Sequence, residues 1–125
     1  MTLAAANPVA FVLTRDRAKA KAFYVGTLGL RLVSEDEFAA VFDLNGTMMR
    51  LTTVETHQPH PHTVIGWDVK DIDAAAKDLM AKGVTFNIYP GFGQDERGIW
   101  TAPDRAAKVA WFNDPDGNVL SLSQH

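Results

Sequence analysis

The sequence predicts an α+β fold in which one structural unit occurs twice. Residues 111–122 are typical of a β-hairpin, because Asp-Pro-Asp-Gly-Asn stands between two apolar runs. Residues 41–51 form a weaker copy of this hairpin around Asn45-Gly46. Residues 9–16 and 64–71 each read as a strand that leads into a helix. We therefore expect two successive copies of one arrangement of strand, helix and hairpin.

The length, net charge and composition of the chain limit its domain organisation and its possible partners. A chain of 125 residues is long enough for one domain with a core, so the two copies are halves of that domain. A net charge of −3 gives no electrostatic reason to expect nucleic acid or an anionic membrane as partner. No apolar run approaches the ~20 residues of a membrane span. The absence of cysteine is compatible with a reducing compartment, and we expect a cytoplasmic protein.

The first copy has clear strand and helix signals. Asp16 is a suitable cap for a helix that runs to about Val25 and ends near Gly26 or Gly29. The acidic segment Ser-Glu-Asp-Glu at 34–37 indicates a solvated turn. The strands are expected at 9–13, 30–33, 38–44 and 48–53.

The second copy begins after an extended join that contains Pro59 and Pro61. Asp71 caps an amphipathic helix that ends at Gly83. Strands are expected at 63–69, 84–88, 108–113 and 118–123.

The second copy is also longer than the first. Val9 and Val64 lie 55 positions apart but Gly46 and Gly117 lie 71 apart, which leaves 16 additional residues. They correspond to residues 89–104, a segment rich in glycine and aromatic side chains. Long loops in compact domains are often functional, and bulky aromatic residues argue against disorder.

Two segments carry a family resemblance. Ala-Phe-Tyr-Val-Gly-Thr-Leu-Gly-Leu-Arg-Leu-Val at 22–33 and Asp-Pro-Asp-Gly-Asn-Val-Leu at 114–120 resemble the vicinal oxygen chelate superfamily, the group of glyoxalases, bleomycin resistance proteins and extradiol dioxygenases. The resemblance implies one domain over 1–125, with tandem βαβββ units at about 8–54 and 63–124 and a linker at about 55–62. It implies a mixed sheet that curls around a cavity, with the helices on its outer face, and a homodimer.

The same resemblance identifies positions where relatives hold a divalent metal. In this sequence these positions are Val9, Arg50, Val64 and Ser121. Two apolar groups, a permanent cation and a neutral hydroxyl do not replace imidazole and carboxylate ligands. We expect no metal and no other cofactor, and the sequence leaves open whether the protein is an enzyme.

Strand alternation predicts which side chains face the cavity. Arg50, Asp68 and Ser121 share the mixed polar and apolar face that a ligand cavity should have. Arg50 then binds a ligand anion, pairs with Asp68 or lies near the rim in water. The candidate walls and lid are the aromatic residues Tyr89, Phe92, Trp100 and Trp111.

The join carries three histidines, His57, His60 and His62. Proline holds the backbone extended and keeps the imidazoles apart, and no cysteine or carboxylate cluster completes a coordination shell. We interpret these histidines as solvated linker residues.

The favoured function is therefore a metal-free small-molecule binding protein that sequesters a drug or metabolite. The alternative is a glyoxalase-like lyase or isomerase, or a dioxygenase-related enzyme, with a relocated metal or a metal-independent mechanism based on Arg50 and Asp68. A partner-binding subunit with a vestigial cavity is the third class.

Overall fold

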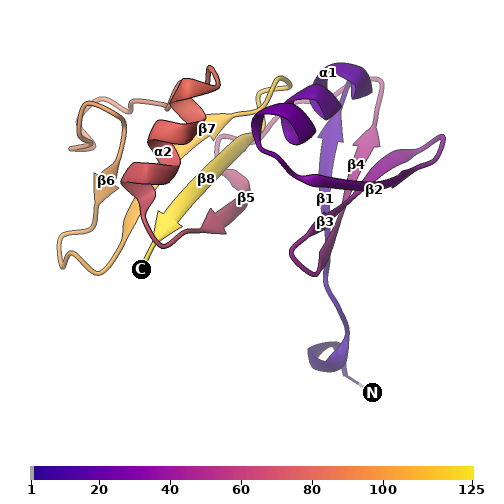
Figure 1. The fold of residues 1–125 in the computed structure, drawn as a ribbon, viewed down its shortest axis with the longest axis horizontal. Helices are drawn as coiled ribbons and strands as arrows, with labels where there is room; N and C mark the ends of the chain where they lie inside the picture. The colour runs from indigo at the N-terminus through magenta and orange to yellow at the C-terminus, as the bar shows by residue number, and fades with distance from the viewer. Residues whose placement is uncertain (1) are drawn as a thin grey trace. The chain divides into compact units, whose positions relative to one another are not determined.

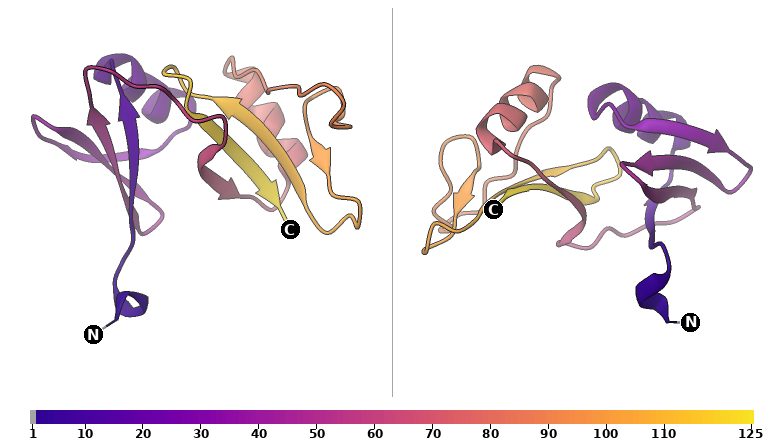
Figure 2. Two further views of the ribbon diagram at one scale, coloured as in Figure 1. Left: turned by 180° about the vertical axis from the view of Figure 1, so that it is seen from behind. Right: turned by 60° about the horizontal axis from the view of Figure 1, so that its bottom comes forward.

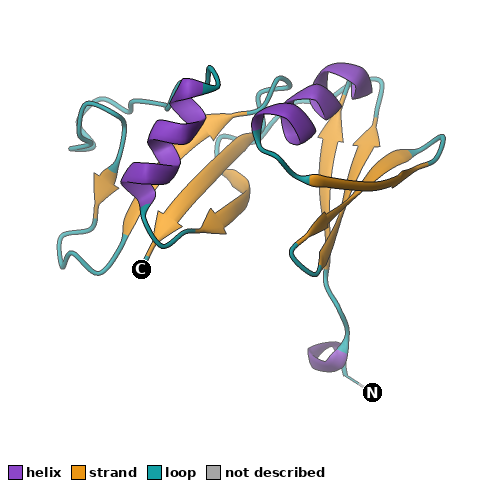
Figure 3. Ribbon diagram, in the orientation of Figure 1, coloured by secondary structure: helices purple, strands orange, loops and turns teal. Residues whose placement is uncertain are grey.

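A computed structural model describes residues 2–125 and divides the chain into two compact units, one ending at Gln58 and the other beginning at Pro59 (Figure 1). Each unit contains one four-stranded mixed sheet with a helix packed on it. The α+β class predicted from the sequence is confirmed, and each unit has the order βαβββ. Figure 3 shows this alternation of strands and helices.

The first unit contains strands β1 to β4. Its sheet order is β1-β4-β3-β2, with β1 parallel to β4 and the other neighbours antiparallel. Met49 and Leu51 point to the helix side and are fully buried, whereas Arg50 points to the other face. The elements are η1 (Leu3–Ala5, a 3-10 turn), β1 (Val9–Thr14), α1 (Arg17–Lys21), η2 (Ala22–Thr27, a π-helical turn), β2 (Arg31–Glu35), β3 (Ala39–Leu44) and β4 (Thr47–Thr53).

The second unit repeats this plan with strands β5 to β8. The order is β5-β8-β7-β6, and β5 is parallel to β8. Helix α2 covers one face of β7 and β8, and the views in Figure 2 agree on this packing. Phe112, Leu120 and Ile72 form the buried centre. The elements are β5 (Thr63–Asp68), α2 (Ile72–Ala81), β6 (Trp100–Thr101), β7 (Lys108–Asn113) and β8 (Val119–Gln124).

Both predicted helix caps are confirmed. The Asp16 carboxylate accepts a hydrogen bond from the Lys19 amide at 3.1 Å, and the Asp71 carboxylate accepts one from the Ala74 amide, also at 3.1 Å. Each bond satisfies an amide that the first turn of a helix leaves without a partner. The same residue type therefore begins the helix of each unit.

The hairpin turns also repeat, but with different numbers of bonds. In the first unit the Asp43 carboxylate accepts one bond from the Gly46 amide at 2.8 Å. In the second unit Oδ1 of Asp114 accepts from the amides of Asp116 and Asn118 at 2.9 Å, and Oδ2 accepts from the Asn118 side chain at 2.8 Å. Asp114 and Asn118 are buried, so the downstream turn is the more firmly built of the two.

One predicted strand is wrong. Residues 84–88 do not form a strand, and Phe86 makes only a single bridge to Phe112. The edge strand beside β7 is instead β6, which lies inside the insertion. The Asn87 amide still bonds to the Trp111 carbonyl at 2.7 Å, but the chain then turns into a loop that Gln94 holds in place. None of the helices within residues 2–125 is long and apolar enough to cross a membrane.

Candidate ligand-binding cavity

The four aromatic residues that the sequence singled out lie together in the second unit. Trp111, on β7, has its ring centroid 5.7 Å from those of both Tyr89 and Phe92. Phe92 also lies 5.6 Å from Trp100 on β6. Most of these pairs meet edge to face, the arrangement that aromatic quadrupoles favour. Strands β6 and β7 supply the tryptophans, and the loop of the insertion that precedes β6 supplies Tyr89 and Phe92.

A cavity of about 340 Å³ opens beside this cluster. Tyr89 and Phe92 are 37% and 47% exposed, so part of each ring faces solvent and is available to a ligand. The volume lies at the lower end of the range for small-molecule sites, roughly 300–1,000 Å³. The lining residues are Pro61, His62, Thr63, Tyr89, Phe92 and Trp111.

The side chain of Gln94 fixes the loop that carries the aromatic wall. Its Oε1 accepts a hydrogen bond from the Tyr89 amide at 2.7 Å. Its Nε2 donates to the carbonyls of Asn87 at 2.8 Å and Gly98 at 2.7 Å. Asp95 adds bonds from the amides of Arg97 and Ile99, both at 2.9 Å. The insertion is therefore an ordered structure built around two polar side chains.

Ser121 lies next to Trp111 but is packed rather than open. It pairs with Trp111 on one side and with Gly66 on the other, so the three residues form one row across the sheet. Ser121 is 9% exposed, and its hydroxyl occupies the space beside the Gly66 α-carbon. Ser121, which the sequence suggested as a ligand-binding residue, is not among the residues that line the cavity.

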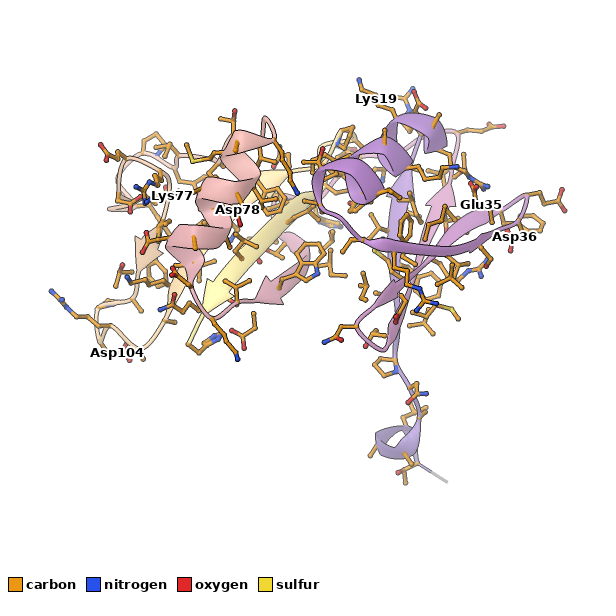
Figure 4. The ribbon with its side chains drawn as sticks, viewed as in Figure 1. Lys19, Glu35, Asp36, Lys77, Asp78 and Asp104 are labelled. Carbon is orange, nitrogen blue, oxygen red and sulfur yellow. The ribbon has the colours of Figure 1, made fainter. Side chains whose placement is uncertain are left out.

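Arg50 pairs within its own unit. Its guanidinium lies 3.5 Å from the Asp36 carboxylate. The amides of Phe38 and Ala39 donate to Oδ1 of Asp36 at 2.8 and 2.9 Å. These two backbone bonds, followed by the charge of Arg50, lower the pKa of Asp36 below 3.8. Figure 4 labels Asp36 beside Glu35 at the β2–β3 hairpin.

The acidic turn that the sequence suggested to be merely solvated therefore has a structural role. Arg17 also donates to the carbonyl of Asp36 at 2.6 Å and lies 3.9 Å from the Glu35 carboxylate. Asp68, the other candidate partner of Arg50, lies 3.2 Å from Nδ1 of His125 in the second unit. Both groups of that pair are largely exposed, which makes the pair weak.

The metal positions inferred from the family resemblance do not fit a metal. Val9 and Val64 offer no donor atom, Arg50 carries a positive charge paired with Asp36, and Ser121 is packed against Gly66. Across residues 2–125, no group of three or more histidine, aspartate or glutamate side chains is arranged to hold a metal ion. These side chains therefore give no basis for a reaction step at a metal ion.

Sequence reasoning missed some of the cavity wall. Pro61, His62 and Thr63 line the cavity, although the sequence suggested that His62 was only a solvated linker residue. The signal that could have located them is their position at the start of β5, which is the neighbour of β8 in the same sheet as Trp111. Sequence analysis also did not identify Asn87 and Gln94, because neither residue lies in a recognisable motif.

The first unit has a smaller hollow of about 290 Å³. Val9 and Met48, which are partners on β1 and β4, line it, and Asp43 is the charged side chain in its lining. Asp43 is already engaged by Gly46 and, at 3.4 Å, by Arg31. The cavity of the second unit is therefore better suited to a ligand. It has more aromatic surface, and its lining has no carboxylate that other protein groups already bind.

Two βαβββ units, each with a mixed four-stranded sheet and one covering helix, define a known class of protein. The chain belongs to the Glyoxalase/Bleomycin resistance protein/Dioxygenase superfamily, whose family model matches residues 6–122.

Individual relatives support this assignment. A superfamily member from Sphaerobacter thermophilus DSM 20745 is 28% identical, with a TM-score of 0.75 over 97% of this chain and 98% of that chain. The lactoylglutathione lyase of Agrobacterium tumefaciens shares the fold, with a TM-score of 0.72 at 15% identity over 96% of this chain and 93% of that chain. "Uncharacterized protein YraH" of Bacillus subtilis (strain 168) is 29% identical over 89% of this chain and 91% of its own length.

Proposed function

We propose that this protein binds a small, flat, largely apolar molecule in the aromatic cavity of its second unit and sequesters it without transforming it. The observation that carries the proposal is the cavity of about 340 Å³ against the partly exposed rings of Tyr89 and Phe92. Exposed aromatic rings in a concave site are suited to stacking on a planar ligand.

The loop architecture also supports binding. Because the three hydrogen bonds of Gln94 hold the insertion in place, the cavity wall is formed before a ligand arrives. A preformed wall lowers the entropy that binding must overcome. The proposal therefore does not require the insertion to fold around its ligand.

The enzymatic alternative has less support. A metal-independent mechanism needs Arg50 and Asp68 to act together, yet Arg50 pairs with Asp36, and Asp68 pairs with His125. A relocated metal needs a cluster of ligands, which residues 2–125 do not provide. The lyase from Agrobacterium tumefaciens resembles this chain in fold only.

The test is an NMR titration with acetophenone, a flat one-ring probe. We expect saturable binding that shifts the indole N–H signal of Trp111, and Phe92→Ala should weaken it about ten-fold because a stacking surface is lost. Phe92 is 47% exposed, so this variant should fold.

Phe38→Ala is the matched control. Phe38 is 64% exposed, lies in the other unit and does not line the cavity, so this variant should bind the probe like the wild type. No saturable shift in the wild type, or an equal loss of affinity in both variants, would contradict the proposal.

The proposal includes a homodimer that acts in the cytoplasm. The two sheets end in edge strands, β1 and β2 in one unit and β5 and β6 in the other, and such edges can pair with a second copy. Sedimentation equilibrium should give twice the mass of 13.7 kDa. A monomer at all concentrations would remove this part of the proposal.

A further inference from the structure

The rim of the aromatic cavity carries a short chain of hydrogen bonds with a defined direction. Nδ2 of Asn87 donates to Oδ1 of Asn113 at 2.8 Å and to the hydroxyl oxygen of Tyr89 at 3.3 Å. Asn113 follows Trp111 by two positions on β7, so the two side chains share a face of the strand. Asn87 thus donates both to Asn113 on the sheet and to Tyr89 on the cavity wall.

This direction determines what Tyr89 can offer a ligand. The Asn87 amide uses both of its protons, one on each neighbour, so the Tyr89 oxygen acts as an acceptor toward Asn87. No acceptor within residues 2–125 takes the proton of the Tyr89 hydroxyl itself. Because Tyr89 lines the cavity, this proton is available for a hydrogen bond to a bound molecule.

The remaining lining narrows the chemistry further. Phe92 and Trp111 provide aromatic surface. The lining contains the polar side chains of His62 and Thr63 but no lysine, arginine, aspartate or glutamate. A cationic ligand group would lose hydration here without meeting a carboxylate, and an anionic group would meet no lysine or arginine, with the imidazole of His62 as the one lining side chain able to carry a positive charge. A neutral acceptor gains a hydrogen bond at a smaller desolvation cost.

We infer that the cavity selects planar aromatic molecules that carry a neutral carbonyl oxygen next to the ring. The Tyr89 hydroxyl donates a hydrogen bond to this oxygen, and Asn87 is the positioning residue that leaves the hydroxyl proton available to the ligand. This inference rests on the proposed function, because it specifies the ligand of the same cavity.

The test compares acetophenone with α-methylstyrene, which has the same shape but a CH₂ group in place of the carbonyl oxygen. Their intrinsic hydrophobicity differs, so the measured quantity is the ratio of the two dissociation constants, obtained by NMR titration for each variant. Tyr89→Phe keeps the ring and removes the hydroxyl. It should shift the ratio against acetophenone by about 3- to 10-fold, the size expected for one neutral hydrogen bond, and leave α-methylstyrene binding unchanged.

Asn87→Asp tests the direction of the hydrogen bond between residue 87 and the Tyr89 hydroxyl. Its carboxylate accepts the Tyr89 proton, and Asn113 can turn its amide to donate, so both contacts survive while the donor is withdrawn from the cavity. This variant should shift the ratio in the same sense as Tyr89→Phe, which a merely structural role of Asn87 would not do. Thr85→Val, a change at an exposed residue outside the cavity lining, should leave the ratio unchanged.

The outcomes separate the two proposals. If both probes bind and neither Tyr89→Phe nor Asn87→Asp changes the ratio, the carbonyl inference is overturned and the aromatic cavity stands. If neither probe binds the wild type, the proposed function fails and the inference fails with it.

Discussion

The side chain of Ser121 occupies the space that a β-carbon on Gly66 would need. The two residues are register partners on β8 and β5, and a β-carbon at position 66 would also lie 3.2 Å from the Ser121 carbonyl oxygen. Gly66→Ala should therefore lower the free energy of unfolding by about 1–3 kcal/mol through overpacking. Urea denaturation measures this change.

Gly26→Ala is the control for that experiment. Gly26 lies in the π-helical turn of the first unit, and a β-carbon there has no neighbour within 4 Å. Alanine should be neutral or stabilising by up to about 1 kcal/mol, because it loses less backbone entropy in a helical turn. Equal destabilisation by both substitutions would refute the packing explanation.

The pKa of Asp36 predicts a pH dependence of stability. The folded state lowers this pKa below 3.8 through backbone bonds from Ala39 and Phe38 and the charge of Arg50. The ionised form thus favours folding, fully so above the unfolded pKa, and this contribution is lost as the pH falls through the folded pKa. Asp36→Asn should be less stable than the wild type at pH ~7, and the difference should shrink below pH ~4.

Chemical denaturation at both pH values checks this prediction. Glu37→Gln is the control, because it removes the same charge from the neighbouring residue, which makes none of these bonds to Ala39, Phe38 or Arg50. A pH-independent difference for Asp36→Asn would show that the carboxylate charge is not responsible.

The two hairpin turns should differ in their sensitivity to substitution. Asp114→Ala removes three hydrogen bonds in a buried turn and should cost about 3 kcal/mol. Asp43→Ala removes one turn bond at a half-buried site and should cost about 1 kcal/mol. Thermal or urea unfolding of the two variants in parallel provides the comparison, and equal costs would contradict it.

Gln94→Met should loosen the insertion. The thioether has a similar length but makes none of the three hydrogen bonds, so we expect a loss of about 1–3 kcal/mol and faster hydrogen exchange at the Tyr89 amide. Gln58→Met, at an exposed position, is the matched control. Unchanged exchange at Tyr89 would mean that other contacts hold the loop.

The regular parts of the fold were predictable because their signals are local. Asp16 and Asp71 precede apolar helical patterns, and a side chain three residues from its target amide caps a helix regardless of the rest of the chain. The turn at Asp114 is local in the same way. The repeated unit followed from these signals occurring twice.

The errors concern contacts between distant residues. The side chain of Asn87 bonds to Asn113 across 26 positions, and no pattern near residue 87 indicates that the strand expected there gives way to a loop. The sequence suggested a ligand anion, Asp68 or water at the rim as the partner of Arg50, yet its partner is Asp36, in a turn that was expected to be solvated. Such pairings depend on the folded sheet, which the local sequence does not encode.

All three tryptophans, Trp67, Trp100 and Trp111, belong to the second unit. Tryptophan emission excited at the red edge of its absorption band therefore reports on that unit alone, whereas far-ultraviolet circular dichroism reports on both. Coincident transitions by the two signals would mean that the units unfold as one cooperative body, and separated transitions would assign a stability to each. Tryptophan fluorescence is thus an intrinsic probe of the unit that contains the aromatic cavity.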